Sequence, residues 1–169
     1  MELFIADEGN KIGEEILHRL RCCGEAAEKA EGITRKCVVA VRFVTDEEIR
    51  IMNRAYRGID RATDVLSFPC VDYPEGKTAK DCSGLLAQAY DDSMDGAFLG
   101  DIVISTEHAA AQAKEYGHGL LREYAYLLMH GLFHLLGYDH INDNDRKKMR
   151  EKEEEALTAI GIRREKENG

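Results

Sequence analysis

The chain has 169 residues, of which 44% are hydrophobic and 33% are charged, a composition typical of one globular domain with its own core. This balance excludes a disordered or fibrous protein, and no apolar run approaches the ~20 residues of a membrane-spanning helix. The net charge of −9 argues against a protein that coats nucleic acid non-specifically, although an acidic chain can still carry a local basic face.

The N-terminus and the cysteines indicate a cytoplasmic protein. The first residues, MELFIADEGNK, carry acids where a signal peptide has its basic region, and no long apolar run follows. The five cysteines are an odd number, scattered and without CxxC spacing, so we expect buried or free thiols and no disulfide framework. We therefore expect a cytoplasmic location and no association with a membrane.

The predicted elements of the first half alternate between strands and helices. A strand over 2–6 precedes a helix over about 9–30, and the β-branched run CVVAVRFV predicts a strand over 37–44. Thr45 and Glu48 then form a capping box that opens a second helix, which runs through Tyr56. TDVLSF (63–68) predicts a strand ended by Pro69, and the polar residues 71–97 predict a long surface insertion.

In the second half, a strand over 98–104 precedes a helix that ends near Tyr116. The next helix, 120–136, is apolar on most sides, so we expect it to be buried and to end at Gly137. A charged helix over 143–160 and a frayed tail over 161–169 complete the chain. We predict a single α+β domain over 1–169, α/β-like, in which helices cover a small mixed sheet of about four strands.

Three histidines at the end of the buried helix predict a metal centre. His130 and His134 are four residues apart, so their imidazoles lie on one face of a helix, one turn apart. Gly137 allows a sharp turn that can bring His140 to the same point. Three neutral imidazoles suit one Zn²⁺ per chain and leave the fourth tetrahedral position for water, as in catalytic zinc sites. Without a metal, the three rings would need partners for six nitrogens.

The histidine spacing matches the extended zincin pattern HExxHxxGxxH, its glycine included, with one exception. In those peptidases the glutamate after the first histidine is the general base, whereas Gly131 stands at this position here. We therefore expect a zincin-like central helix without the peptidase base. Asp139, beside His140, is the nearest carboxylate in sequence and the candidate replacement.

The segment HGLFHLLGYDH resembles the signature of the YbeY family of bacterial endoribonucleases. Two upstream segments, MNRAYRGIDRATDVLSFP (52–69) and LGDIVIS (99–105), resemble the same family in the same order. The resemblance covers about residues 35–145, and the insertion at 71–97 is longer than the usual pattern. It implies a zinc-dependent endonuclease for single-stranded RNA that acts in 16S rRNA 3′-end maturation and ribosome quality control, with ribosomal partners.

The same resemblance implies that His130, His134 and His140 are the zinc ligands and that Arg57 serves the RNA or the reaction. Residues 35–61 are also the one locally basic stretch, with Arg57 and Arg61 on either side of a glycine-containing turn. Guanidinium groups bind phosphate in a bidentate fashion and can neutralise charge that builds on phosphorus. Arg57 and Arg61 are therefore candidate RNA-binding residues, and Arg57 is also a candidate catalytic residue.

The remaining arginines and polar strand residues have two interpretations each. Arg50 and Arg54 also fit a solvated helix face with ion pairs such as Glu47 to Arg50. The strand residues Thr63, Asp64 and Ser67 either shape a cleft or satisfy loop amides. Asp101 either holds a ligand imidazole in place or faces the surface.

Two other functions are compatible with the residues. One is a metal-dependent hydrolase of another substrate, such as a peptide. The other is a non-enzymatic ribosome assembly factor with structural zinc, whose fourth position a protein group such as Cys70 would close. The occupant of that fourth position distinguishes a structural site from a catalytic one.

Overall fold

The computed structural model describes residues 1–9 and 11–164, and within these residues five strands form one mixed sheet. The strands are β1 (Glu2–Ala6), β2 (Cys37–Val44), β3 (Val65–Pro69), β4 (Tyr90–Asp91) and β5 (Gly96–Ser105). The order across the sheet is β1-β2-β5-β3, and β4 pairs with β5. Neighbours among β1, β2 and β5 are parallel, whereas β3 and β4 run antiparallel to β5.

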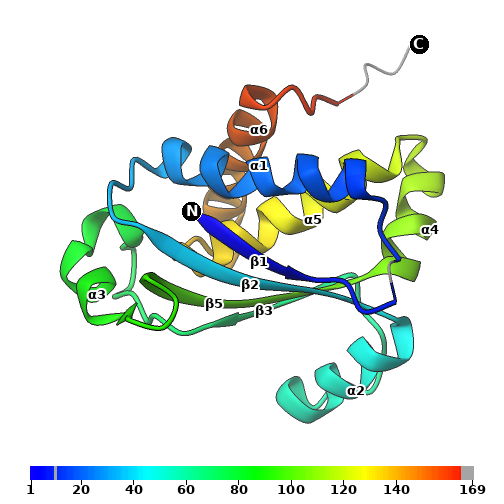
Figure 1. Ribbon diagram of the computed structural model, residues 1–169, viewed down its shortest axis with the longest axis horizontal. Coiled ribbons are helices and arrows are strands. Elements are labelled where there is room, and N and C mark those ends of the chain that lie inside the picture. The colour runs from blue at the N-terminus through cyan, green and yellow to red at the C-terminus, as the bar shows by residue number, and fades with distance from the viewer. Residues whose placement is uncertain (10, 165–169) are drawn as a thin grey trace.

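Helices cover the two faces of this sheet unequally (Figure 1). They are α1 (Glu14–Glu31), α2 (Asp46–Arg57), α3 (Ser83–Gln88), α4 (Thr106–Tyr116), α5 (Leu120–Leu135) and α6 (Asp143–Ala159), with a 3₁₀ helix η1 (Ala79–Asp81). Figure 1 shows α1, α5 and α6 stacked on one side and α2 alone on the other. In the part of the chain that the structure covers, no helix combines the length and apolarity needed to cross a bilayer.

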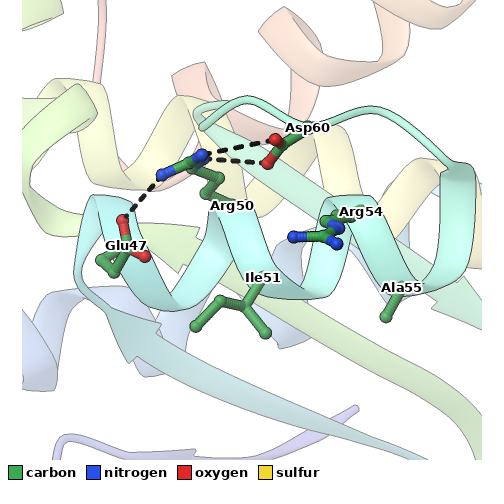
Figure 2. Close-up of a pocket in the computed structure, with 6 residues that line it drawn as sticks. All are labelled: Glu47, Arg50, Ile51, Arg54, Ala55 and Asp60. Atoms are coloured by element: carbon green, nitrogen blue, oxygen red, sulfur yellow. Dashed lines mark hydrogen bonds and ion pairs between the residues drawn. The ribbon is translucent and has the colours of Figure 1, made fainter.

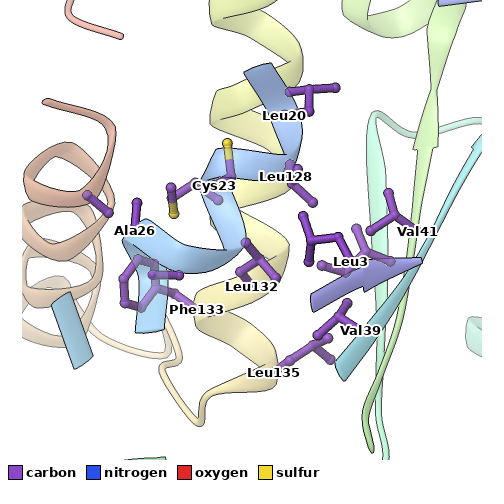
Figure 3. Packing of buried hydrophobic residues seen from close by; sticks show 14 of the residues in the cluster. Leu3, Leu20, Cys23, Ala26, Val39, Val41, Leu128, Leu132, Phe133 and Leu135 are labelled. Carbon is purple, nitrogen blue, oxygen red and sulfur yellow. The ribbon is translucent and has the colours of Figure 1, made fainter. Parts of the chain in front are cut away.

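The main core lies between the sheet and helices α1 and α5 (Figure 3). Leu3, Val39 and Val41 project from the strands toward Leu128 and Leu132 of α5, and all five side chains are buried. Because successive strand residues point to opposite faces, the alternate positions form the other face of the sheet. The apolar character that the sequence showed on most sides of α5 is explained by this central position.

The second face of the sheet is only partly covered. Helix α2 packs Ile49 against Val44, Leu66 and Val103 in a small separate cluster at one end. Away from α2, strand residues of the same face are exposed, including Phe4 at 44% of its surface. We refer to this side as the open face.

The predicted single α+β domain with a mixed sheet is confirmed, and several boundaries differ. Helix α1 begins at Glu14, because the Asp7 carboxylate accepts hydrogen bonds from the amides of Lys11 (3.1 Å) and Ile12 (2.8 Å) and holds them outside the helix. Strand β3 begins two residues later than predicted and includes Pro69.

Two segments expected at the surface take part in the fold. Residues 71–97 contain η1, α3, β4 and the start of β5, and they bury Val71, Ala79 and Leu86. This segment supplies a fifth strand where about four were expected. Of the predicted tail, 165–169 lie outside the described residues, whereas Ile162 is buried and its carbonyl oxygen accepts a hydrogen bond from Arg122 (3.2 Å).

Helix α5 approaches β5 most closely at Gly131. A Cβ atom placed on Gly131 would lie 2.9 Å from both Cδ1 and Cγ2 of Ile102, a side chain with no exposed surface. We expect Gly131→Ala to lower the free energy of unfolding by about 1–3 kcal/mol, since overpacking a core outweighs the gain in helix propensity.

Gly84 of α3 is the matched control, because a Cβ there would meet no atom within 4 Å. Urea denaturation should show Gly84→Ala at least as stable as the parent chain. Equal stability of Gly131→Ala and the parent would contradict the close approach of α5 to β5.

Candidate metal centre

The last turns of α5 and the turn after it bring the three predicted histidines together. The amide of Tyr138 donates to the Phe133 carbonyl (3.0 Å) and the amide of Gly137 to the His134 carbonyl (3.1 Å), a Schellman ending. Gly137 has a φ of +96°, a value that favours glycine. The glycine stop predicted from sequence therefore turns the chain back and delivers His140.

The imidazoles of His130, His134 and His140 converge on one point. One nitrogen from each ring lies within 4.8 Å of the others. The Nε2 atoms of His130 and His134 are 3.1 Å apart, close to the ~3.3 Å expected for two nitrogens in a tetrahedral site with Zn–N bonds near 2.0–2.1 Å. Among the described residues, only these three form a cluster of this kind.

The opposite nitrogens of the two helical histidines are held by the protein. Nδ1 of His130 lies 2.7 Å from Oε1 of Glu153, whose side chain is buried on α6. Nδ1 of His134 lies 3.1 Å from the Tyr138 carbonyl oxygen. Both contacts fix the ring orientation and leave Nε2 directed at the shared point, the arrangement typical of metal-binding histidines.

His134 is neutral near pH 7. Burial, together with the neighbouring His130 and His140, lowers the pKa of His134 to about 4. A neutral imidazole offers its lone pair without first losing a proton. The site is therefore prepared to receive a cation.

The three histidines differ in their access to solvent. His130 and His134 are half-buried, whereas His140 is exposed. The cluster therefore opens on the side of His140, where a ligand from solution can approach. Cys70, the candidate for closing a structural site, is exposed after β3 and is not a member of the cluster.

A buried carboxylate on α1 supports the turn that carries the ligands. Glu31 is 3% exposed and accepts hydrogen bonds from the hydroxyls of Tyr138 (2.6 Å) and Thr78 (2.5 Å). Tyr138 is the residue whose carbonyl contacts His134. Helix α1 and the segment before η1 therefore both hold the turn in place.

Of the other candidate residues, Asp139 is next to the histidine cluster in the chain, whereas Arg57 and Arg61 lie in another part of the fold. Asp139 is exposed, and its Oδ1 accepts the amide of His140 (2.7 Å). Arg57 ends α2 on the side of the sheet opposite α5, and its side chain is exposed, as is that of Arg61 (Figure 1). The contacts of the described residues do not join either arginine to the histidines.

The two arginines left open between interpretations lie on the outer surface of α2 (Figure 2). Arg50 forms ion pairs with Asp60 (3.0 Å) and Glu47 (3.4 Å), as expected for a helix face that is exposed to solvent. Together with Ile51, Arg54 and Ala55 these residues line a shallow pocket of about 260 Å³.

The polar residues in β3 and next to it differ in the contacts that they make and in the face of the sheet on which they lie. Asp64 accepts the Val65 amide (2.7 Å) and a hydrogen bond from Gln112 (3.2 Å), so it satisfies local donors. Ser67 pairs with Ile102 across the sheet and therefore shares the face toward α5. Asp101, one residue before Ile102, belongs to the open face, so Glu153 and not Asp101 holds a candidate ligand.

Sequence reasoning missed Glu153, although its position carries a signal. It lies four residues after the buried Met149 and three before the buried Ala156, inside the apolar stripe of a charged helix. A carboxylate in such a stripe needs a buried partner. The imidazole of His130 is that partner.

Comparison with known proteins identifies the family of this chain. A family model described as "Endoribonuclease YbeY" matches residues 4–161. Proteins named Endoribonuclease YbeY from Clostridium botulinum (strain Eklund 17B / Type B) and Clostridium perfringens (strain ATCC 13124) are 46% and 43% identical over 159 and 168 residues. These alignments cover 93% and 96% of this chain and 95% and 99% of the relatives.

A solution structure of a Thermotoga maritima protein shares the fold, with a TM-score of 0.56 and 23% identity over 99% of both chains. The family match covers nearly the whole domain, including α5, the turn at Gly137 and Glu153 on α6. On this match and these relatives, the chain belongs to the YbeY endoribonuclease family.

Proposed function

We propose that this chain is a zinc-dependent endoribonuclease that cleaves single-stranded RNA, in the cytoplasm and with ribosomal partners, during 16S rRNA 3′-end maturation and ribosome quality control. The observation that carries the proposal is the convergence of three imidazoles on one point that is open to solvent at His140. The RNA substrate is supported by the family, whose members include the clostridial relatives named endoribonucleases.

The residues fit a zinc ion. All three donors are imidazoles, two of them have their second nitrogen bound to a protein acceptor, and the Nε2 atoms of His130 and His134 are spaced for tetrahedral coordination. Bound there, zinc supplies Lewis-acid chemistry for phosphodiester hydrolysis. The chain's own part is to hold the three rings close together, with two of them fixed in orientation, before the ion and the substrate arrive.

Two further residues are proposed to act on the substrate. Arg57 binds an RNA phosphate through its exposed guanidinium, which is charged at every relevant pH. Asp139 is exposed and adjacent to His140 in the chain, and its Oδ1 accepts a hydrogen bond from the His140 amide. Asp139 is thus the proposed acceptor for a proton released by the attacking water.

The packing at Gly131 disfavours a peptidase. In zincin peptidases this position carries the glutamate base, whereas here the backbone is pressed against Ile102 and has no room for a side chain. Position 131 therefore does not supply the general base that defines that class of enzyme. RNA is the better-supported substrate.

Replacing a candidate ligand tests the proposal directly. His130→Ala should lose both bound zinc, measured by elemental analysis, and cleavage of a single-stranded RNA oligonucleotide. His18→Ala is the control, because His18 is exposed on α1 and outside the cluster. Retention of stoichiometric zinc by a folded His130→Ala protein would refute the ligand set.

The contact between Glu153 and His130 predicts an effect on affinity. Glu153→Gln removes the charge that orients and polarises the imidazole while keeping the side-chain volume. We expect about 10–100-fold weaker zinc binding, measured by competition with a chromophoric chelator. Glu151→Gln on the exposed side of α6 should leave the affinity unchanged, and equal affinities of the two variants would show that Glu153 does not support the metal.

Arg57 can be separated from the metal by its own substitution. Arg57→Glu should retain zinc and lose RNA cleavage, since a carboxylate repels the phosphate that the guanidinium binds. Arg21→Glu, at an exposed position on α1, controls for the change in net charge. Full cleavage by Arg57→Glu would remove Arg57 from the mechanism.

A further inference from the structure

A row of side chains with an aromatic ring at each end crosses the open face of the sheet. The strand register aligns Phe4 on β1 with Ala40, Ala40 with Asp101, and Asp101 with Phe68 on β3. Aligned residues project from the same face, and three strand spacings of about 4.8 Å separate the two rings by roughly 14 Å. Phe4 is 44% exposed and Phe68 is half-buried.

Helix α2 adds a third ring at the β3 end of the row. Tyr56 is 73% exposed, and its ring centroid lies 5.1 Å from that of Phe68 in an edge-to-face arrangement. Large aromatic side chains exposed on one contiguous surface typically mark a binding site. Figure 1 shows α2 on this side of the sheet, and Ala40 and Asp101 between the two ends of the row are half-buried, so the row is partly accessible from solution.

Arg42 contributes positive charge to the same surface, which also carries the exposed Glu2 two residues from Phe4 on β1. Arg42 projects from β2 in the adjacent row, paired with Ala6 on one side and Val103 on the other, and it is exposed. Arg57 follows Tyr56 at the end of α2. The one acid in the row, Asp101, is half-buried; burial raises the pKa of its carboxyl and nearby Arg42 partly offsets this effect.

The open face and helix α5 lie on opposite sides of the sheet, and β3 is the edge strand beside β5. Ser67 shares a face with Ile102, which meets Gly131 beside His130, whereas Phe68 points to the open face. In the described residues β3 is the last strand on its side of the sheet. A chain that rounds the edge of β3 from Phe68 therefore arrives on the side of the sheet where α5 carries the histidines.

We propose that Phe4, Phe68 and Tyr56 form a stacking platform for the bases of single-stranded RNA, that Arg42 binds its backbone phosphates, and that the strand crosses the edge of β3 toward the metal centre. The inference rests on the proposed nuclease function and adds the surface that holds the substrate. Single-stranded nucleic acid binds in this way elsewhere, because every base has a face that stacks on an aromatic ring and every linkage has a charge.

The spacing of the rings favours RNA over a protein partner. A protein would need a continuous apolar area, whereas Asp101 and Arg42 lie between and beside the rings. Separate rings with a charged group nearby match separate bases joined by phosphates. The small side chain of Ala40 leaves space between the two ends of the row.

The test measures binding of a fluorescent 2′-O-methyl oligouridylate to the zinc-loaded full chain by anisotropy, with the oligonucleotide checked for integrity on a gel. Phe4→Ala and Tyr56→Ala should each bind about tenfold more weakly, the usual effect of removing one stacking ring. Tyr116→Ala is the matched control, because Tyr116 on α4 is 64% exposed. Arg42→Gln should reduce the slope of log affinity against log salt by about 0.7.

Leucine variants distinguish stacking from simple apolar contact. Phe4→Leu keeps most of the apolar surface and loses the ring, so it should bind RNA as weakly as Phe4→Ala. Phe68 packs against the α2 cluster, so it is probed by photocrosslinking of 5-iodouridine RNA to the intact chain. Crosslinks to peptides that contain Phe4, Tyr56 or Phe68 support the platform.

Unchanged RNA affinity of Phe4→Ala and Tyr56→Ala, or full affinity of Phe4→Leu, overturns the platform. The platform is also overturned if these variants bind RNA as the parent chain does but no longer bind a ribosomal protein. If the Phe4→Ala and Tyr56→Ala variants cleave RNA with zinc as fast as the parent chain, the platform is overturned and the nuclease proposal is retained. RNA binding that depends on the rings, without any zinc-dependent cleavage, supports the platform and overturns the nuclease proposal.

Discussion

Helix α5 is buried on nearly every side and yet has to present two imidazoles to solvent. Seven of its apolar side chains have 1% or less of their surface exposed, namely Ala125, Leu127, Leu128, Met129, Leu132, Phe133 and Leu135. His130 and His134, together with Tyr126, form a half-buried strip along the helix. Because the rest of the helix is fixed by the core, these two rings start from a rigid backbone, which lowers the entropic cost of assembling a metal site.

Placing polar rings on a core helix requires buried partners, and these partners organise the surrounding helices. Glu153 reaches His130 from α6, and Glu31 reaches Tyr138 from α1, with both carboxylates 3% exposed or less. An unpaired carboxylate at such depth would be costly, so each helix can dock only where its acid finds a donor. The same contacts that hold the fold together therefore hold the candidate ligands.

Local signals account for the parts of the structure that were predictable from sequence. The β-branched run at 37–44 is β2, the Thr45 capping box is present, and the histidines converge because their i, i+4 spacing and the glycine turn are local features. The position of Glu153 in an apolar stripe indicates that it has a buried partner, but the identity of that partner is not a local feature, because Glu153 and His130 are 23 residues apart and Glu31 and Tyr138 are 107 apart. Residues 71–97 looked like an insertion because their few buried side chains follow no regular period.

Strand β3 has side chains on each face of the sheet through the two-residue period of a β-strand. Ser67 shares the face of Ile102, toward α5, and Phe68 lies on the open face with the proposed platform. A longer β3, or another strand beyond it, would lengthen the path from the aromatic rings of the platform around the sheet edge to the metal centre. The exposed edge is ordinarily a liability for aggregation. Here the brevity of β3 and the proline at its end limit that liability, and the edge stays open at the place where a substrate would have to cross.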